Sequence, residues 1–486
     1  MIRLAESEHD AGRLPEIPTL VLRSGQTGAG RIDFADVPLV DARLRARSLR
    51  SERVVLPAER LTGQELAGVA GRAVWARHAG ANVRHDVVAG QLTELQDGET
   101  LREKVSVRSP FPALALVDFL REVSADLLFT PPPLRAAFII DDPNLQRDSY
   151  GFITSFTGLV EHARTHAYHV AMAMVPLDAG RARPAALELF AQNRRHVSLT
   201  MHGNNHTKRE LARSMPTDER LALLAQALNR VASFEQRTGI DVARIMVPPH
   251  GAASEEALHD MLRLGYEGAA ISRPYPWLDR PPAERPLTSW WPADVATGFP
   301  VLGRYHLERP RDEIALRAFL DQPLLLYGHH GDVGSGFEVL AAAAADINQM
   351  GGVAWGPLDG IARTNFARRR EGDVLRVRLH SRRVAIEVPE GVDTLRVELP
   401  PDYGATELEA VTCARAGDAP LSCDTSQAAE GIGVSQGTVE VRLLQESRLD
   451  PHRIHPPSRR LWPRLRRGVT ESRDRLAPYV RTAVRR

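Results

Sequence analysis

The sequence is poor in cysteine and lysine, and each scarcity limits what the protein can be. Its two cysteines, Cys413 and Cys423, have no metal-binding spacing and either close a hairpin disulfide or stay as free thiols. Lys104 and Lys208 are the only lysines, so arginine carries almost all of the positive charge. The formal net charge is +1 at pH 7, which gives no global field to attract nucleic acid or acidic membranes.

Long apolar runs are also missing. No stretch approaches the ~18 to 20 apolar residues of a transmembrane helix. The first residues mix charges and lack the continuous apolar segment of a secretory signal. We therefore expect a cytoplasmic protein with no transmembrane segment and no nucleic-acid partner.

At 486 residues the chain is too long for one ordinary core, and its pattern of apolar and polar residues changes along the sequence. Residues 1–130 combine short strand candidates with a helix expected at 63–79, which indicates a small α/β domain of unknown role. Residues 367–445 alternate apolar and polar positions with little helical signal, as in an antiparallel β-sandwich. Residues 446–486 are rich in Arg and Pro, which indicates a solvated, poorly ordered tail, or else a docking segment for an acidic partner or a membrane surface.

Residues 131–366 alternate apolar strands with helical segments, the clearest helices being expected at 217–238 and 337–350. Strands separated by helices predict a parallel sheet, and about seven of them favour a barrel over an open sheet. The strands are expected at 136–140, 169–175, 196–201, 243–247, 268–271, 324–327 and 353–355.

Two adjacent carboxylates, Asp141 and Asp142, follow the first of these strands directly. Their mutual repulsion next to a buried strand needs compensation, which a bound cation provides. One carboxylate would then ligate the ion while the other handles a proton. The ordinary alternative is a turn or a helix cap before Pro143.

A histidine pair, His202 and His206, follows another strand. Histidines four apart on a helical turn point to the same side and can grip one metal ion, although many such pairs are only surface residues. Two neutral imidazoles and one carboxylate leave a coordination position open for water, as catalytic zinc sites do.

Two further clusters stand at strand ends. His250 follows the strand at 243–247, and His329 and His330 follow the strand at 324–327. The carboxyl ends of parallel barrel strands meet at one mouth, where barrel enzymes place their chemistry. Histidines that merely cap strands remain the alternative for His250 and for one of the other two.

The order Asp-Asp, His-x-x-x-His, Pro-Pro-x-Gly and a late strand ending in histidine resembles the polysaccharide deacetylase superfamily, carbohydrate esterase family 4, over about residues 134–365. The resemblance implies a distorted (β/α)7 barrel, between the N-terminal α/β domain and the C-terminal antiparallel β domain. It also implies a catalytic base at Asp141, metal ligands at Asp142, His202 and His206, and an acid at His330 or His329.

The sequence departs from that family at several positions. Gly203 stands where the chitin and peptidoglycan enzymes usually carry Ser or Thr, as in a subgroup of uncharacterised predicted deacetylases. Val247 stands where the family's third motif usually has an arginine that orients the catalytic aspartate. We expect His250, in the same motif, to replace that arginine. Residues 276–279 lie where a fourth motif belongs but match it poorly.

These features predict a metal-dependent hydrolase that removes an acyl group from an acetylated carbohydrate or a related amide. The expected cofactor is one divalent metal ion per chain, Zn²⁺ by default, with Co²⁺, Ni²⁺ or Mn²⁺ as alternatives. An aromatic loop with Tyr275, Trp277, Trp290 and Trp291 would either stack against sugar rings or form a small core of its own. A glycosidase on a related barrel and a non-catalytic carbohydrate-binding scaffold are the competing hypotheses.

Overall fold

The structure is a computed structural model in which the chain forms two compact units. Unit 1 comprises Met1–Phe129, Leu278–Trp290 and Pro310–Leu320, and unit 2 comprises the rest. The residues that the structure describes are 2–5, 17–78, 83–90, 111, 113–146, 149–150, 154–272, 292–308, 311–399, 408–415, 417–457, 462–463, 465–469 and 472.

Unit 1 is built on a seven-stranded sheet with the strand order β1-β2-β7-β6-β5-β3-β4. The β1–β2 and β2–β7 pairs are parallel and the other neighbours are antiparallel. The elements are β1 (Ile2–Ala5), β2 (Thr19–Arg23), β3 (Gly25–Phe34), β4 (Ser48–Pro57), β5 (Gln64–Val69), β6 (Arg72–His78), β7 (His85–Ala89), α3 (Ala113–Val123), the 3-10 turn η1 (Ala125–Leu127) and α8 (Arg311–Phe319).

The prediction of a helix at residues 63–79 is wrong, because this segment forms the β5–β6 hairpin. Ala70 and Gly71 connect the two strands, and both have positive φ, 49° and 77°. Such a pair makes a tight hairpin turn whose twist suits antiparallel strands. The apolar spacing of the segment resembled a helix, but the turn at Ala70 and Gly71 reverses the chain in its middle.

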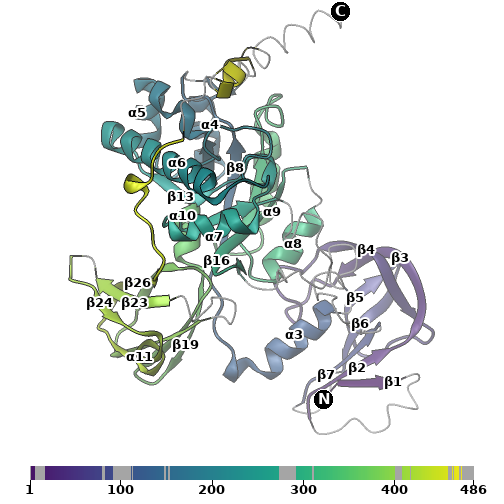
Figure 1. The fold of residues 1–486 in the computed structure, drawn as a ribbon. Coiled ribbons are helices and arrows are strands. Elements are labelled where there is room, and N and C mark those ends of the chain that lie inside the picture. Colours follow the sequence, from purple (N-terminus) through teal and green to yellow (C-terminus); the bar gives the residue numbers. More distant parts are fainter. Residues whose placement is uncertain are drawn as a thin grey trace, which may run out of the picture. The chain divides into compact units, whose positions relative to one another are not determined.

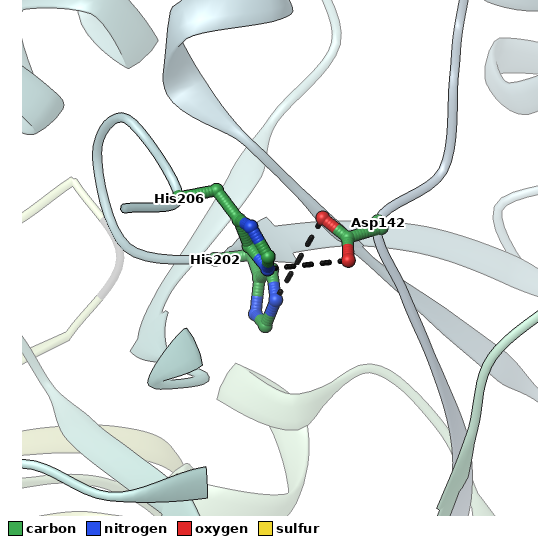
Figure 2. A group of neighbouring side chains, drawn as sticks. All are labelled: Asp142, His202 and His206. Atoms are coloured by element: carbon green, nitrogen blue, oxygen red, sulfur yellow. Dashed lines mark ion pairs between the residues drawn. The ribbon is translucent and has the colours of Figure 1, made fainter. Parts of the chain in front are cut away.

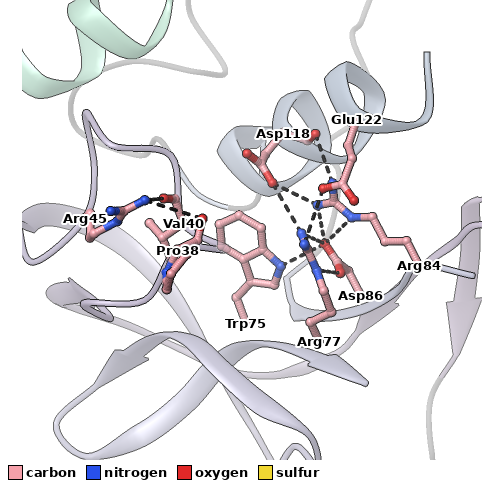
Figure 3. A network of polar contacts seen from close by, with 9 residues as sticks. All are labelled: Pro38, Val40, Arg45, Trp75, Arg77, Arg84, Asp86, Asp118 and Glu122. Carbon is pink, nitrogen blue, oxygen red and sulfur yellow. Dashed lines mark hydrogen bonds and ion pairs between the residues drawn. The ribbon is translucent and has the colours of Figure 1, made fainter. Parts of the chain in front are cut away.

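A buried carboxylate joins helix α3 to this sheet (Figure 3). Asp86 on β7 is fully buried and accepts hydrogen bonds from Trp75 Nε1 (3.2 Å) and Arg77 Nε (2.8 Å). Arg84 bridges Asp86 to Asp118 of α3, at 2.5 and 2.8 Å. A buried charge is tolerated when it is paired and hydrogen-bonded in this way, so the network fixes α3 on the sheet.

Unit 2 contains the predicted barrel. Its ring of seven parallel strands closes because β8 pairs with both β11 and β17. The ring strands, in ring order, are β8 (Leu134–Asp141), β11 (Val170–Met174), β12 (Val197–Met201), β13 (Val242–Met246), β14 (Gly268–Ile271), β16 (Phe299–His306) and β17 (Leu324–Gly328).

The barrel prediction is confirmed, although one strand was assigned differently. The segment β18 (Val353–Trp355) lies beside the start of β8 and outside the ring. The seventh ring strand is β16, which sequence reasoning missed. Pro300 and Gly303 interrupt its apolar pattern, and both are poor strand residues. The short β15 (Asp294–Ala296) pairs antiparallel with β16.

Helices pack around the barrel strands (Figure 1). Helix α6 spans residues 217–238 as predicted, and Gly239 ends it in the left-handed conformation with φ 67°. Within the described residues, none of the helices has the length and hydropathy of a membrane span. The remaining elements are α4 (Phe156–Thr165), α5 (Pro184–Gln192), α6 (Thr217–Thr238), α7 (Glu255–Arg263), α9 (Glu338–Asn348), α10 (Leu358–Arg363), the 3-10 turns η2 (Pro176–Arg181) and η3 (Pro249–Gly251), and the hairpin of β9 (Ser149–Tyr150) and β10 (Thr154–Ser155).

The C-terminal part forms two four-stranded sheets, β19-β20-β22-β25 and β21-β26-β23-β24, that share one apolar core. All pairings are antiparallel except β20–β22. Cys413 and Cys423 are free thiols on β23 and β24. The elements are β19 (Phe366–Glu371), β20 (Val374–Leu379), β21 (Arg383–Val388), β22 (Thr394–Glu398), β23 (Leu408–Arg415), β24 (Leu421–Cys423), α11 (Thr425–Glu430), β25 (Ile432–Gly433), β26 (Gly437–Gln445) and η7 (Pro451–Arg453).

A buried arginine connects the barrel to these sheets. Arg135 on β8 is 1% exposed and donates to Asn365 Oδ1 (2.5 Å) and to the Asp321 carbonyl (2.8 Å). Asn365 lies just before β19 and exchanges backbone and side-chain hydrogen bonds with His380. The contact satisfies a buried guanidinium at the junction, which is a requirement for burying a charge.

We predict that acid destabilises the barrel partly through His169, at the start of β11. This histidine is fully buried, and burial lowers its pKa from 6.5 to about 4. The unfolded chain therefore binds a proton first as pH falls, so the free energy of unfolding decreases between pH 6.5 and 4, by roughly 3 kcal/mol. Urea unfolding at several pH values measures this slope. His169→Asn should flatten it, whereas the exposed His452→Asn should not; equal slopes in all three proteins would contradict the prediction.

Candidate metal centre

The predicted metal ligands lie together at the carboxyl ends of β8 and β12 (Figure 2). Asp142 follows β8, and His202 and His206 belong to the loop that follows β12. His206 Nε2 is 3.2 Å from Asp142 Oδ2, and His202 Nε2 is 3.9 Å from Asp142 Oδ1. The three ligand atoms lie within 4.8 Å of one another.

This spacing fits a divalent ion. Ligand atoms about 2.1 Å from a tetrahedral zinc ion are about 3.4 Å apart, close to the separations found here. The donor set of two imidazoles and one carboxylate is also one that zinc accepts while keeping a position open. A small adjustment of the side chains would bring all three atoms to the ion.

The protonation states suit metal binding as well. Burial lowers the pKa of His202 to about 4, so its imidazole is neutral at physiological pH. His202 Nδ1 donates to the Val247 carbonyl at 2.8 Å, which leaves Nε2 as the ligand atom. Burial would raise the pKa of Asp142, but His206 and His202 outweigh it and hold that pKa well below its ordinary value. The carboxylate is therefore ionised.

The histidine loop is not the helical turn that the spacing suggested. Residues 202–206 form an irregular loop in which Gly203 and His206 have φ of 62° and 55°. A Cβ atom at position 203 would lie 2.4 Å from Glu210 Oε2 and 2.6 Å from Pro249 Cγ. Gly203 is therefore required, because a side chain there would be strained and would contact Glu210 and Pro249.

Glu210 holds the loop in shape, and sequence reasoning missed it. Its fully buried carboxylate accepts the backbone N–H groups of Asn204 (2.9 Å), Asn205 (2.9 Å) and His206 (3.2 Å). Three donors on one carboxylate satisfy its charge inside the protein. Arg230 on α6 adds bonds to the carbonyl and side chain of Asn204 and to the side chain of Asn205. The ligand His206 is thus positioned through its backbone.

We predict that Glu210→Gln weakens metal affinity about 10- to 100-fold, the usual effect of losing a group that orients a ligand. The amide nitrogen of glutamine would face a backbone N–H and leave it unsatisfied. Competition with a chromogenic chelator measures the metal dissociation constant. The control is Glu188→Gln, on the exposed side of α5, which should match the wild type. Unchanged affinity in the Glu210 variant would show that the loop does not depend on this carboxylate.

Asp141, the predicted base, forms a buried ion pair with Arg304 of β16. Arg304 Nη1 lies 2.7 and 2.9 Å from the two carboxylate oxygens, and both residues are about 2% exposed or less. The guanidinium also stacks on Tyr327, 4.2 Å from the ring centroid. Burial would raise the pKa of Asp141, but the charge and hydrogen bonds of Arg304 bring it below its ordinary value.

Arg304 thus supplies the cationic neighbour that we had assigned to His250. His250 is exposed, adopts φ 60° in η3, and its ring centroid is 5.7 Å from that of His206. It lies at the same mouth, on the histidine side of the site, so a catalytic role for His250 stays a prediction. Val247 is fully buried and contributes only its carbonyl.

His329 and His330 follow β17 at the same mouth. His329 Nε2 is 3.9 Å from Asp141 Oδ2, and His330 is the next residue in the turn. Asp332 lies between two histidines, with Oδ2 3.8 Å from His329 Nδ1 and 3.4 Å from His306 Nε2. It also accepts the backbone N–H of His329 at 2.6 Å. This arrangement favours His329 over His330 as the acid.

Other sequence expectations fall outside this description. The aromatic residues Tyr275, Trp277, Trp290 and Trp291, and the weak fourth motif at residues 276–279, lie outside the described residues. The position of Asp332, three residues after His329, was visible in the sequence as a carboxylate near a candidate acid. Arg304 and Glu210 carried no comparable motif.

Comparison with known proteins finds a structural match to family 4 carbohydrate esterases at low identity over about half of the chain, as the motifs predicted. No family model matches the chain, and no curated protein matches it. A Mycobacterium smegmatis structure assigned to the polysaccharide deacetylases is 13% identical, with a TM-score of 0.34, and covers 49% of this chain and 95% of its own.

Two other similar structures come from bacilli. A family 4 carbohydrate esterase of Bacillus subtilis is 13% identical, with a TM-score of 0.30, over 51% of this chain and 88% of its own. A family 4 pseudoenzyme of Bacillus anthracis is 12% identical, with a TM-score of 0.28, over 47% of this chain and 65% of its own.

Proposed function

We propose that this protein is a metal-dependent hydrolase that removes an acyl group, with acetyl as the expected one, from an N- or O-acylated carbohydrate or a related amide. The observation that supports the proposal is the placement of Asp142, His202 and His206 beside the Asp141–Arg304 pair at one barrel mouth. Metal ligands next to an ionised carboxylate that is not itself a ligand are what such hydrolysis needs.

The chain's own residues would divide the work as follows. Asp142, His202 and His206 would hold a divalent ion, which when bound would lower the pKa of a bound water toward about 7 and polarise an acyl oxygen. Asp141, kept ionised by Arg304, accepts a proton from the attacking water as it adds to the acyl carbon. His202 keeps its Nε2 in place through the bond from Nδ1 to Val247.

The leaving group needs a proton, which we assign to His329. When the bond between the acyl carbon and nitrogen or oxygen breaks, the departing amine or alcohol takes the Nε2 proton of His329. Asp332 Oδ2 lies 3.8 Å from Nδ1 of the ring and accepts the backbone N–H of His329, which positions the ring. Water and substrate thus become a carboxylic acid and an amine or alcohol, and His330 remains the alternative donor.

The competing hypotheses differ in what they need at this mouth. A non-catalytic scaffold was suggested by the missing arginine at Val247, and Arg304 now supplies a cation for Asp141. A glycosidase would need two carboxylates on opposite sides of a sugar. Here Asp141 pairs with Arg304, and Asp142 pairs with the two histidines. This pairing favours removal of an acyl group over cleavage of a glycosidic bond.

The test combines elemental analysis of the purified protein with assays on acetylated sugars and chito-oligosaccharides. We expect about one equivalent of divalent metal per chain and release of acetate from at least one substrate class, lost after chelation and restored by Zn²⁺ or Co²⁺. Release of reducing sugar without acetate would support the glycosidase. Sugar binding without either product would support the scaffold.

A further inference from the structure

The C-terminal segment reaches the candidate metal centre. The turn η7 contacts α6 through the bond from Asn229 Nδ2 to the Pro451 carbonyl, and the arginines at 466 and 467 lie at the barrel mouth. Arg467 Nη1 lies 3.2 Å from Asp142 Oδ1, and its Nε lies 2.7 Å from Asp178 Oδ2 in η2. The neighbouring Arg466 donates to the carbonyl of His206. Two consecutive arginines thus contact two of the three ligand residues.

A metal ion would compete with Arg467 for the carboxylate of Asp142. Its guanidinium offers a positive charge to Asp142 Oδ1, an oxygen that lies 3.9 Å from His202 Nε2 on the ligand-facing side. A divalent ion bound there would be about 2 Å from the carboxylate, so two cations would crowd one carboxylate group. The second carboxylate, Asp178, holds Nε of the same guanidinium at 2.7 Å and so anchors Arg467 over Asp142 in the docked state.

The rest of the segment is held loosely. Pro456, Pro457, Trp462 and Pro463 border a cavity of about 1310 Å³ that lies between this segment, η2, α6 and the loop at residues 205–208. Trp462, Leu465 and Val469 are 68%, 61% and 69% exposed, so these apolar side chains bury little surface on the barrel. The polar contacts described for this segment at the mouth are those of Arg466 and Arg467, so loss of these contacts would favour its release.

We propose that residues 462–463 and 465–469 belong to a self-inhibitory strap in which Arg467 takes the place of the metal ion on Asp142. Strap docking and metal binding then exclude each other, and a docked strap also covers the mouth that a substrate must enter. The proposal rests on the metal site of the proposed function. Because coupling between two ligands is reciprocal, the strap lowers metal affinity by the same factor by which metal weakens strap docking.

The test measures Zn²⁺ and Co²⁺ dissociation constants of the full chain by chelator competition. Arg467→Ala should bind metal at least about 5-fold more tightly than wild type, within the range typical of such coupling. Asp178→Asn, which removes the second anchor without touching a ligand, should tighten binding in the same direction. The matched control is Arg453→Ala, an exposed arginine of the same C-terminal region, which should leave affinity unchanged. The double variant with Arg467→Ala and Asp178→Asn should bind metal about as tightly as Arg467→Ala alone, because both changes remove the same contact.

A second readout follows the strap itself. Trypsin should cleave after Arg466 and Arg467 faster in the presence of Zn²⁺ than in chelator, and Asp178→Asn should be cleaved fast in both. Equal or weaker metal binding by Arg467→Ala, or slower cleavage with Zn²⁺, would overturn the strap. Absence of metal binding in every variant would instead overturn the metal site of the proposed function.

Discussion

Asp141→Asn is expected to lower turnover by about 10²- to 10⁴-fold while metal content stays near the wild-type value. Loss of a general base typically costs this much. Asp141 is bonded to Arg304 and is not among the three clustered ligand residues, so the ion should still bind. Activity on the substrate found by the acetate screen, with elemental analysis of the same sample, measures both quantities.

His206→Ala is the matched comparison, and it should lose both metal and activity. Its Nε2 lies 3.2 Å from Asp142 Oδ2 and is a predicted ligand atom, and alanine offers no replacement. The contrast separates proton transfer from metal retention. Near wild-type turnover in the Asp141 variant would exclude this residue as the base, and loss of metal there would make it part of the ligand set instead.

Arg304→Met is the second change with a large expected effect. It leaves the Asp141 carboxylate buried without its cation, and breaking a buried pair from one side costs about 3–5 kcal/mol. Loss of the Arg304 charge would let burial dominate and raise the pKa of Asp141. The base would be protonated at higher pH, so the acidic limb of the pH profile of kcat/KM should move upward. Urea unfolding and pH–rate profiles measure the two effects.

Two further variants test whether the lost stability of Arg304→Met comes from the broken ion pair. Combining Arg304→Met with Asp141→Asn removes the unpaired charge, so the double variant should be more stable than Arg304→Met alone. Arg194→Met removes a surface pair with the exposed Asp241 and should change stability by less than about 1 kcal/mol. If Arg304→Met is as stable as the wild type and keeps its pH profile, Arg304 does not position the base.

The clustering of Asp142, His202 and His206 was predictable because it depends on chain order and on one geometric rule. Asp142 and His202 each follow an apolar strand at once, and parallel strands bring their carboxyl ends to one mouth. That inference required no knowledge of the backbone conformation. The shape of the histidine loop could not be inferred in this way, because histidines four apart occur both on helices and in loops. Here the hydrogen bonds to Glu210 stabilise the loop.

The partner of Asp141 was hidden for a different reason. Arg304 is 163 residues away in the sequence and lies on the strand whose apolar pattern Pro300 and Gly303 interrupt. The missed strand and the missed arginine are therefore one error. In the N-terminal unit, the helix at residues 63–79 failed because the turn at Ala70 and Gly71 outweighs helical spacing. Apolar spacing alone does not report turns, which depend on the φ values of single residues.

The buried Arg135 sets the size of the smallest fragment that should fold. A fragment that ends with the barrel strands would lack Asn365 and leave Arg135 short of an acceptor in the interior. It would also expose Val295 of β15, which belongs to the apolar core of the C-terminal sheets. We therefore expect residues 1–445 to express as a soluble piece and residues 1–364 to aggregate, so crystallisation or labelling work on the mouth should keep both parts.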